Sequence, residues 1–217
     1  MVRKETFGFT KEEIEIIKKL NTPNKIQDFL NSLQINFEEN GETCMSPRMV
    51  LKEKKAHCIE AAMFAAAVLR FHNYPPLILD FEATHGDEDH VIAIFKKNNH
   101  WGAISKTNHA ILRYREPVYK TVRELAMSYF HEYYLFANGK KTLRKVSKPV
   151  NLRIFDKKGW MTSNDNVWYI NDYLVNLKHK NILNRSQINN LRRVDPIEIQ
   201  AGKIVEYNDP RGNKDYP

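Results

Sequence analysis

Cysteines and long hydrophobic runs are both scarce in this sequence. The 217 residues include two cysteines, Cys44 and Cys58. In a reducing compartment such a pair is not expected to form a structural disulfide, whereas a lone thiol with histidines elsewhere is a candidate nucleophile. The longest apolar stretch, residues 61–69, is far shorter than the ~20 residues of a membrane span, and residues 1–13 lack the features of a secretory signal. We therefore expect a cytoplasmic protein that does not enter a membrane.

Length and composition are those of an ordinary globular domain. The chain is 42% hydrophobic and 28% charged, and a chain of 217 residues can bury roughly 70% of the surface that its unfolded form exposes. No internal repeat or low-complexity segment divides the sequence. We expect a single domain over residues 1–217, with a core at about 20–135 and a basic extension of the same domain at 136–217.

The formal charge of +8 permits an anionic partner without requiring one. Basic residues gather in the second half of the chain and alternate with apolar residues typical of strands, which favours the solvated face of a sheet. No homeodomain, zinc-finger or RNP-type motif is present, so nucleic-acid binding would rest on charge alone. The basic residues concerned are Lys140, Lys141, Arg144, Lys145, Lys148, Arg153, Lys157, Lys158, Arg185, Arg192 and Arg193.

Helix-start signals recur in the first third of the chain. Thr10 begins a capping box, and Thr22 and Ser46 each precede a proline that can occupy the first turn of a helix. A further helix is predicted over residues 57–72, where strong helix formers and several alanines leave no charged face in the middle. This helix should be buried on most sides.

Beyond residue 76 the hydrophobic period becomes that of strands. Strands are predicted at residues 77–79, 90–95 and 100–105, with Asn98-Asn99 as a hairpin turn. Later segments suggest a helix at 121–134, a strand at 152–155, a helix at 171–178 and an extended piece at 197–207. This order predicts an α+β fold in which the buried helix carrying Cys58 packs on an antiparallel sheet.

Cys58 lies at the very start of the predicted buried helix. There the unpaired N–H groups and the positive end of the helix dipole would stabilise a thiolate, which is the nucleophilic form of cysteine. The same N–H groups could bind a developing oxyanion. The competing interpretation is that Cys58, like Cys44, is a small buried hydrophobic residue.

His90 begins a predicted strand, at a sheet edge that can face the start of the helix. From there it could take the proton of Cys58 and return it to a leaving amine. Folding the hairpin about Asn98-Asn99 places His90 opposite roughly Thr107. Residues 105–108 therefore return beside His90, and Ser105 and Asn108 are both candidates to orient its ring.

The same residues carry a resemblance to a known family. The run from Lys55 to Phe64 around Cys58, then Leu69-Arg70, Asp89-His90-Val91 and Trp101, resembles the bacterial-type members of the transglutaminase-like superfamily. The resemblance covers roughly residues 20–110. It implies a papain-like architecture, with a cysteine at the head of a central helix and a histidine and an acid on neighbouring antiparallel strands. It also implies acyl transfer through a Cys58 thioester, with His90 as general base.

In that superfamily the acid usually follows the hairpin tryptophan by a few residues, and here that position is Ser105. No Asp or Glu occurs between Asp89 and Glu116. Two functions follow. One is a thiol-dependent enzyme acting on a peptide, protein or small amide, by hydrolysis, deamidation or amine transfer, without a cofactor. The other is a catalytically silent transglutaminase-like fold that serves as a binding module.

Three other interpretations compete for individual residues. The acidic loop at 84–90 contains His85 and His90, but these do not form a pair with the spacing typical of zinc sites, and a solvated loop is expected. Neighbouring residues of a helix point about 100° apart, so His57 is expected to pack at the surface or behind the site. Tyr129, Tyr133 and Tyr134 are expected to pack in the core.

Overall fold

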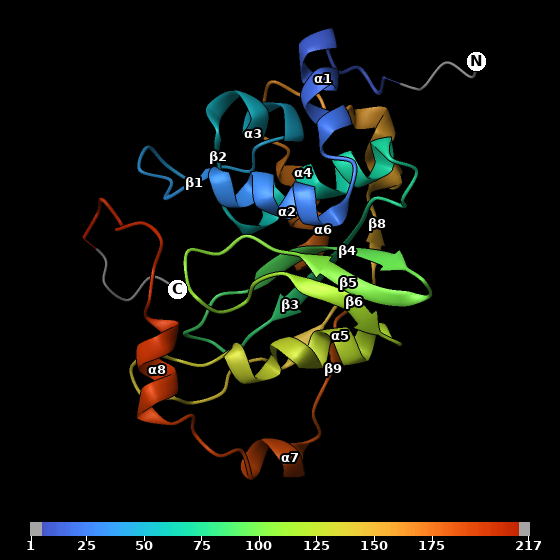
Figure 1. Cartoon of the computed structure of the whole chain (residues 1–217). Helices are drawn as coiled ribbons and strands as arrows, with labels where there is room; N and C mark the ends of the chain where they lie inside the picture. Colours follow the sequence, from blue (N-terminus) through green and yellow to red (C-terminus); the bar gives the residue numbers. More distant parts are fainter. Residues whose placement is uncertain (1–5, 213–217) are drawn as a thin grey trace.

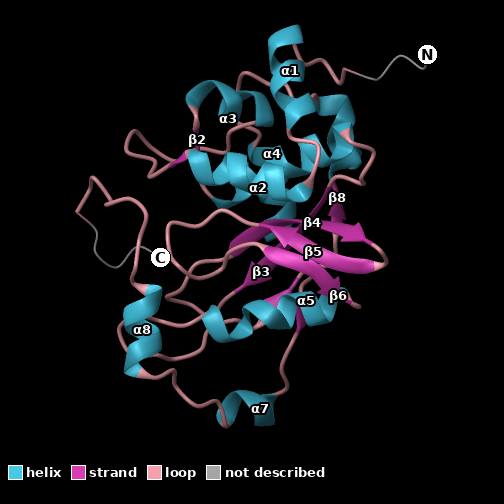
Figure 2. Ribbon diagram, in the orientation of Figure 1, coloured by secondary structure: helices cyan, strands magenta, loops and turns pink. Residues whose placement is uncertain are grey.

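The computed structural model describes residues 6–212. The first five residues, on which the prediction about a secretory signal partly depends, lie outside this range, as do residues 213–217. One antiparallel sheet separates two groups of helices, with α4 on one face and α5 on the other (Figures 1 and 2). The fold is therefore α+β, as the sequence predicted.

Seven strands form this sheet, in the order β6-β5-β4-β3-β7-β9, with β8 also paired to β3. Every ladder in it is antiparallel. A separate parallel pair joins β1 (Gln34–Ile35) to β2 (Lys55–Ala56). The seven strands are β3 (Leu77–Glu82), β4 (His90–Lys97), β5 (His100–Ile104), β6 (Arg115–Tyr119), β7 (Lys145–Val146), β8 (Val150–Asn151) and β9 (Lys180–Asn181).

The helix predicted over residues 57–72 is α4, Cys58–Phe71, flanked by His57 and His72 as caps. It packs against β4, and its small alanines, at most 2% exposed, allow this close approach. The capping hydroxyls of Thr10, Thr22 and Ser46 each accept a backbone N–H, as predicted. The helices that they begin are α1 (Lys11–Lys19), α2 (Pro23–Ser32) and α3 (Pro47–Glu53).

The β4–β5 hairpin sets the geometry of the site. Asn98 and Asn99 both have positive φ, 49° and 62°, as a tight two-residue hairpin turn requires. The register pairs Lys97 with His100 and continues to Ala93 opposite Ile104. Because side chains alternate along strands, this register places the side chains of His90 and Ser105 on the same face of the sheet.

The second half of the chain departs most from the predictions. Residues 152–155, predicted as a strand, belong to the 3₁₀ helix η2, Leu152–Lys158, whose first turn is capped by the side chain of Asn151. The predicted extended piece at 197–207 contains α8, Pro196–Gly202, because Asp195 and Glu198 form a capping box around Pro196. The remaining helices are α5 (Val122–Tyr129), η1 (Phe130–Glu132), α6 (Trp168–Val175) and α7 (Arg185–Asn189).

Two hydrophobic clusters fill the two sides of the sheet. The cluster around α4 extends into the second half of the chain, where Leu152, Trp160 and Ile170 are fully buried against it. The smaller cluster joins α5 to the other face through Ile92, Ile94 and neighbouring residues. Within the described residues, no helix is long and apolar enough to cross a membrane.

Candidate active site

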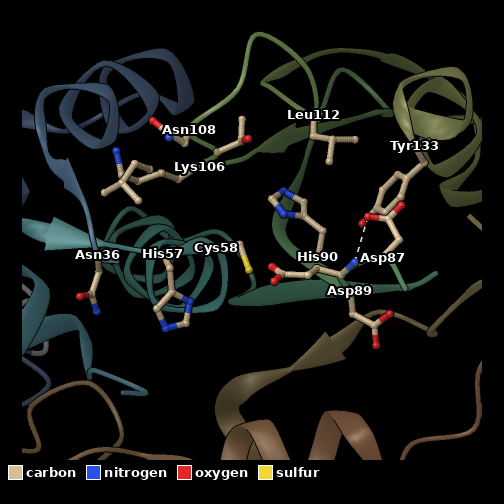
Figure 3. A pocket seen from close by; sticks show the side chains of 13 residues that line it. Asn36, His57, Cys58, Asp87, Asp89, His90, Lys106, Asn108, Leu112 and Tyr133 are labelled. Atoms are coloured by element: carbon tan, nitrogen blue, oxygen red, sulfur yellow. Dashed lines mark hydrogen bonds between the residues drawn. The ribbon is translucent and has the colours of Figure 1, made fainter. Parts of the chain in front are cut away.

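A cleft opens at the start of α4, where the first helical residue is Cys58 (Figure 3). Cys58 as a residue is partly exposed, whereas Cys44 is fully buried. The first N–H groups of a helix have no partner within the helix, so they face the region of the thiol. The volume of the hollow is about 80 Å³, which is several times the cavity volume of about 10–15 Å³ that one water molecule needs. Its size suits the end of a side chain or a small acyl group.

His90 lies on the opposite side of this cleft and is 7% exposed. Its Nε2 lies 2.8 Å from the Ser105 hydroxyl, which itself donates to the carbonyl oxygen of Leu112 at 2.6 Å. A hydroxyl has a single proton, and here the Leu112 carbonyl receives it. Ser105 must therefore accept a hydrogen bond from His90 Nε2–H. This fixes the ring so that Nδ1 is the nitrogen available to a thiol.

Helix α2 holds Ser105 and Lys106 in place. The buried amide of Gln27 pairs with the backbone of Ser105 in both directions, at 2.8 and 3.0 Å. Lys106 Nζ donates to the carbonyl oxygens of Leu30 and Leu33, each at 2.8 Å, and so caps the end of α2. The orienting hydroxyl of Ser105 thus belongs to a rigid part of the fold.

The side chain of Asn108, the other candidate to orient the ring of His90, binds the backbone of Tyr207 instead. Its amide nitrogen donates to the carbonyl oxygen of Tyr207 at 2.9 Å, and its amide oxygen accepts from the Tyr207 N–H at 3.0 Å. Asn108 lines the cleft, but its amide fastens residues near 207 to this wall. The structure thus brings Ser105, and not Asn108, to the ring of His90.

His57 is the residue whose role the sequence analysis missed. It lies outside the helix as its cap, with extended backbone (φ −96°, ψ −173°), so the 100° rule for helical neighbours does not apply to it. Its Nε2 donates to the carbonyl oxygen of Thr43 at 3.1 Å and lies 3.4 Å from Glu60 and 3.5 Å from Glu38. Figure 3 shows the thiol of Cys58 with His57 on one side and His90 on the other.

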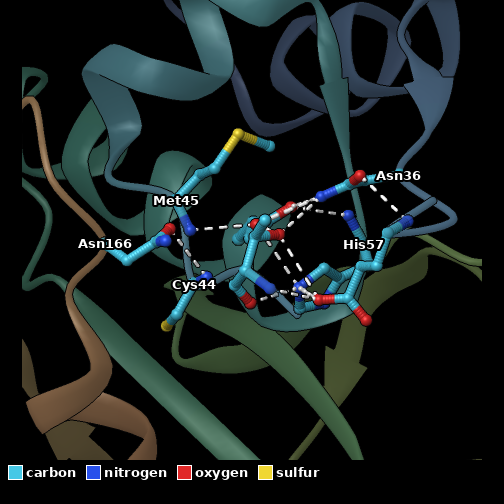
Figure 4. A network of polar contacts seen from close by, with 8 residues as sticks. Asn36, Cys44, Met45, His57 and Asn166 are labelled. Atoms are coloured by element: carbon cyan, nitrogen blue, oxygen red, sulfur yellow. Dashed lines mark hydrogen bonds and ion pairs between the residues drawn. The ribbon is translucent and has the colours of Figure 1, made fainter. Parts of the chain in front are cut away.

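Figure 4 shows the polar network that includes Asn36, Met45 and His57, and the carboxylate of Glu60 accepts a hydrogen bond from each of these three residues. The Glu60 carboxylate is fully buried and accepts hydrogen bonds from the Thr43 hydroxyl at 2.7 Å and the Met45 N–H at 2.9 Å. It also accepts from the His57 N–H at 3.0 Å and the Asn36 amide at 3.1 Å. Burial alone would raise the pKa of Glu60, but His57 and these donors outweigh it and lower the pKa to about 2.

The two imidazoles decide the state of the thiol. Burial alone would raise the pKa of Cys58, but hydrogen bonds and charge from His57 and His90 outweigh it and lower the pKa to about 5. Burial likewise opposes the charge on His57, yet Cys58 and Glu60 raise the pKa of its ring well above the usual value. At neutral pH the cleft thus contains a thiolate beside at least one imidazolium.

An acidic loop forms one rim of the cleft, and it is folded by its own side chains. Asp87 accepts hydrogen bonds from the Thr142 hydroxyl and the Glu88 N–H, and Asp89 accepts from the Ala83 N–H at 2.8 Å. Burial and the negative charge of Cys58 raise the pKa of Glu88 to about 7. This rim favours substrates that are not anionic.

Two further features lie apart from the cleft. Trp101 packs, partly buried, in the smaller hydrophobic cluster, with Lys96 Nζ 5.6 Å from its ring centre. The prediction that the basic residues of the second half form the solvated face of a sheet is wrong, because these residues lie mostly in loops and short helices. Five of them line a separate hollow: Lys140, Lys141, Arg144, Arg192 and Arg193.

Over residues 6–212, no group of three or more His, Cys, Asp or Glu side chains is arranged to hold a metal ion. No protein-family model matches this chain, and no curated protein matches it either.

Proposed function

We propose that this chain is a thiol-dependent acyl-transfer enzyme with Cys58 as nucleophile. The observation that supports it best is the thiol at the start of α4 with a histidine on each side, each ring held through its outer nitrogen. A buried structural cysteine needs neither a cationic neighbour nor an opening to solvent. The substrate is an amide or related acyl group on a peptide, a protein or a small molecule.

The reaction begins when Nδ1 of His90 takes the proton of the Cys58 thiol and the resulting thiolate attacks the acyl carbon. A C–S bond forms, and the electron pair of the C=O bond moves to oxygen. On collapse of this intermediate His90 donates a proton to the leaving amine, and a thioester remains. His90 then takes a proton from water or an acceptor amine, which attacks the thioester and frees the thiol.

The two histidines have different roles in this proposal. His57, held by Glu60 and Glu38, is a lasting positive charge that stabilises the thiolate. His90, held by the neutral hydroxyl of Ser105, is free to gain and lose a proton. In this way the negative charge that an acid would place beside His90 is placed instead beside His57, by Glu60 and Glu38. A transglutaminase-like, papain-like ancestry and a cytoplasmic location fit this proposal.

The alternative is a binding module that has kept the fold without the activity. Ser105 favours it, because a hydroxyl orients an imidazole but gives no charge to stabilise the imidazolium. Under this alternative Cys58 would be activated as a thiol but would not complete an acyl transfer.

Acylation by p-nitrophenyl acetate separates the two functions. We expect a burst of p-nitrophenol and a mass increase of one acetyl group on Cys58, abolished in Cys58→Ser and retained in the matched control Cys44→Ala. His90→Gln should slow turnover of the acetylated enzyme. If the unaltered chain is acetylated once on Cys58 but then releases no further p-nitrophenol, or releases no more than Cys58→Ser, the proposed function is wrong and the binding module remains.

A further inference from the structure

The hydroxyl of Tyr133 is buried without a hydrogen-bond partner among the described residues. The residue is 2% exposed. Its neighbours differ, since the hydroxyl of Tyr129 donates to the carbonyl oxygen of Arg113 at 3.0 Å and the hydroxyl of Tyr134 donates to the carbonyl oxygen of Glu198 at 2.6 Å. Leaving a buried hydroxyl unpaired costs free energy, and the few examples in native proteins often mark a functional site.

Tyr133 lines the same cleft as Cys58 and His90, and Figure 3 shows its ring pointing toward the acidic rim. Its backbone is fixed by a hydrogen bond from the Thr142 N–H to the Tyr133 carbonyl at 3.1 Å. The ring packs edge-on against Phe81, with the centroids 6.2 Å apart. The hydroxyl is thus held in position before any substrate arrives, which is the condition for efficient stabilisation of a transition state.

We propose that the Tyr133 hydroxyl donates a hydrogen bond to the acyl oxygen of the substrate as Cys58 attacks. The proposal rests on the proposed function and adds a catalytic residue to it. When the C–S bond forms and the C=O electron pair moves to oxygen, Tyr133 O–H and the N–H groups at the start of α4 share the new negative charge. Collapse restores the C=O bond, breaks the bond to the leaving group and leaves the phenol unchanged.

The surroundings of Tyr133 suit a donor. Burial and then the negative charge of Cys58 raise the pKa of the phenol well above its usual value, and Asp87, Asp89 and Asp80 act in the same direction. The hydroxyl therefore keeps its proton throughout the neutral range.

Two reagents with different chemistry test this role in Tyr133→Phe, which removes only the hydroxyl. Acylation of Cys58 by p-nitrophenyl acetate passes through an oxyanion, whereas alkylation by iodoacetamide does not. We expect acylation to slow about 100-fold, the scale seen when one oxyanion donor is removed, while alkylation keeps its rate and pH profile. The matched control, Tyr129→Phe, should leave both rates unchanged.

The thermal midpoint supplies an independent readout. Tyr133→Phe should melt no lower than the parent, because no hydrogen bond is lost, and Tyr129→Phe should melt lower. Equal acylation of Tyr133→Phe and the parent would overturn this inference alone. A parallel fall in acylation and alkylation would also overturn it, since that result would assign Tyr133 to the shape of the cleft. If the parent itself is not acylated, the proposed function is lost and this inference with it.

Discussion

The two cysteines of this protein have opposite environments within one small region. Cys44 is fully buried, its N–H donates to the side chain of Asn166 at 3.0 Å, and burial followed by the charge of Glu60 raises its pKa to about 12. Cys58 is partly exposed, with a pKa lowered to about 5. Glu60 contributes to both effects: its charge acts directly on Cys44, but it reaches Cys58 through the imidazolium of His57. The sign of an electrostatic effect thus depends on what lies between the two groups.

The largest expected effect is the difference between the two thiols toward iodoacetamide. At pH 7 Cys58 should react at least about 100-fold faster than Cys44, even after allowing for the lower intrinsic nucleophilicity of a low-pKa thiolate. Its rate should reach a plateau by about pH 7, because the thiolate fraction saturates above the lowered pKa. The single variants Cys44→Ala and Cys58→Ala isolate each rate by intact mass. If the alkylation rate of Cys58 instead inflects near pH 8.5, as for an ordinary thiol, the proposed difference in pKa between the two cysteines is wrong.

Glu60→Gln should change how stability depends on acid. A carboxylate whose folded pKa lies below its unfolded value stabilises the fold above about pH 4.5, and this stability is lost as the pH falls toward 2. For a shift from 4.5 to about 2 the contribution is up to about 3 kcal/mol. In urea unfolding at pH 7, 5 and 3, the parent should lose about 2 kcal/mol of this contribution by pH 3, where the folded carboxylate is still mostly ionised, and Glu60→Gln should not.

The exposed Glu15→Gln serves as the control for that experiment, since Glu15 pairs only with Lys18 at the surface. Parallel losses of stability in the parent and Glu60→Gln would show that Glu60 is not the buried anion described. Glu60→Gln should also bring the two thiols closer together in pKa, because it weakens the charge on His57 and removes a charge near Cys44.

The two histidines should differ in a way that separates their roles. His57→Gln and His90→Gln should both raise the pKa of Cys58, and the alkylation inflection should move further for His57, whose hydrogen bond has the larger influence. At a pH high enough to form the thiolate, His57→Gln should recover acyl transfer and His90→Gln should not, because only His90 moves a proton. A larger shift for His90→Gln would reverse the assignment.

The smallest effect is expected at the orienting residue. Ser105→Ala removes one neutral hydrogen bond of the kind worth about 0.5–1.5 kcal/mol, so acyl transfer should slow about 2- to 10-fold. Asn108→Ala, on the same wall of the cleft, should leave the rate of acyl transfer unchanged because its amide binds Tyr207. Steady-state rates at saturating ester measure both. Equal losses of rate in the two variants would mean that acyl transfer depends on the shape of this wall of the cleft and not on the contact between Ser105 and His90.

Features that depend on local rules could be predicted from the sequence. Helix α4, its cysteine at the first position and the Asn98-Asn99 turn each follow from a short run of residues. Counting along the hairpin from that turn was enough to bring Ser105 and Asn108 near His90. The choice between them could not be made, because it depends on Leu112 and Tyr207, which no pairing rule places there.

The predictions that were wrong for His57 and for two later segments share a physical cause, because in each of them a capping residue determines the backbone conformation. His57 was treated as a helical residue, although Glu60 three positions on is the pattern of a capping box and could have indicated an extended cap. The segments at 152–155 and 197–207 have the apolar composition of strands, but the caps Asn151 and Asp195 begin helical turns there. The prediction that Tyr133 packs in the core is confirmed, but its unpaired hydroxyl is visible only in three dimensions.

The fastening of Asn108 to Tyr207 also bears on the order of events during synthesis. The two residues are 99 positions apart, and the same wall is joined by Ala110 to Ile204 and by Arg113 to Glu206. A chain emerging from the ribosome has Cys58, His90 and Ser105 long before it has residues 204–207. One side of the cleft therefore cannot close until most of the chain is translated, and a nascent polypeptide carries Cys58 before this side of the cleft is complete.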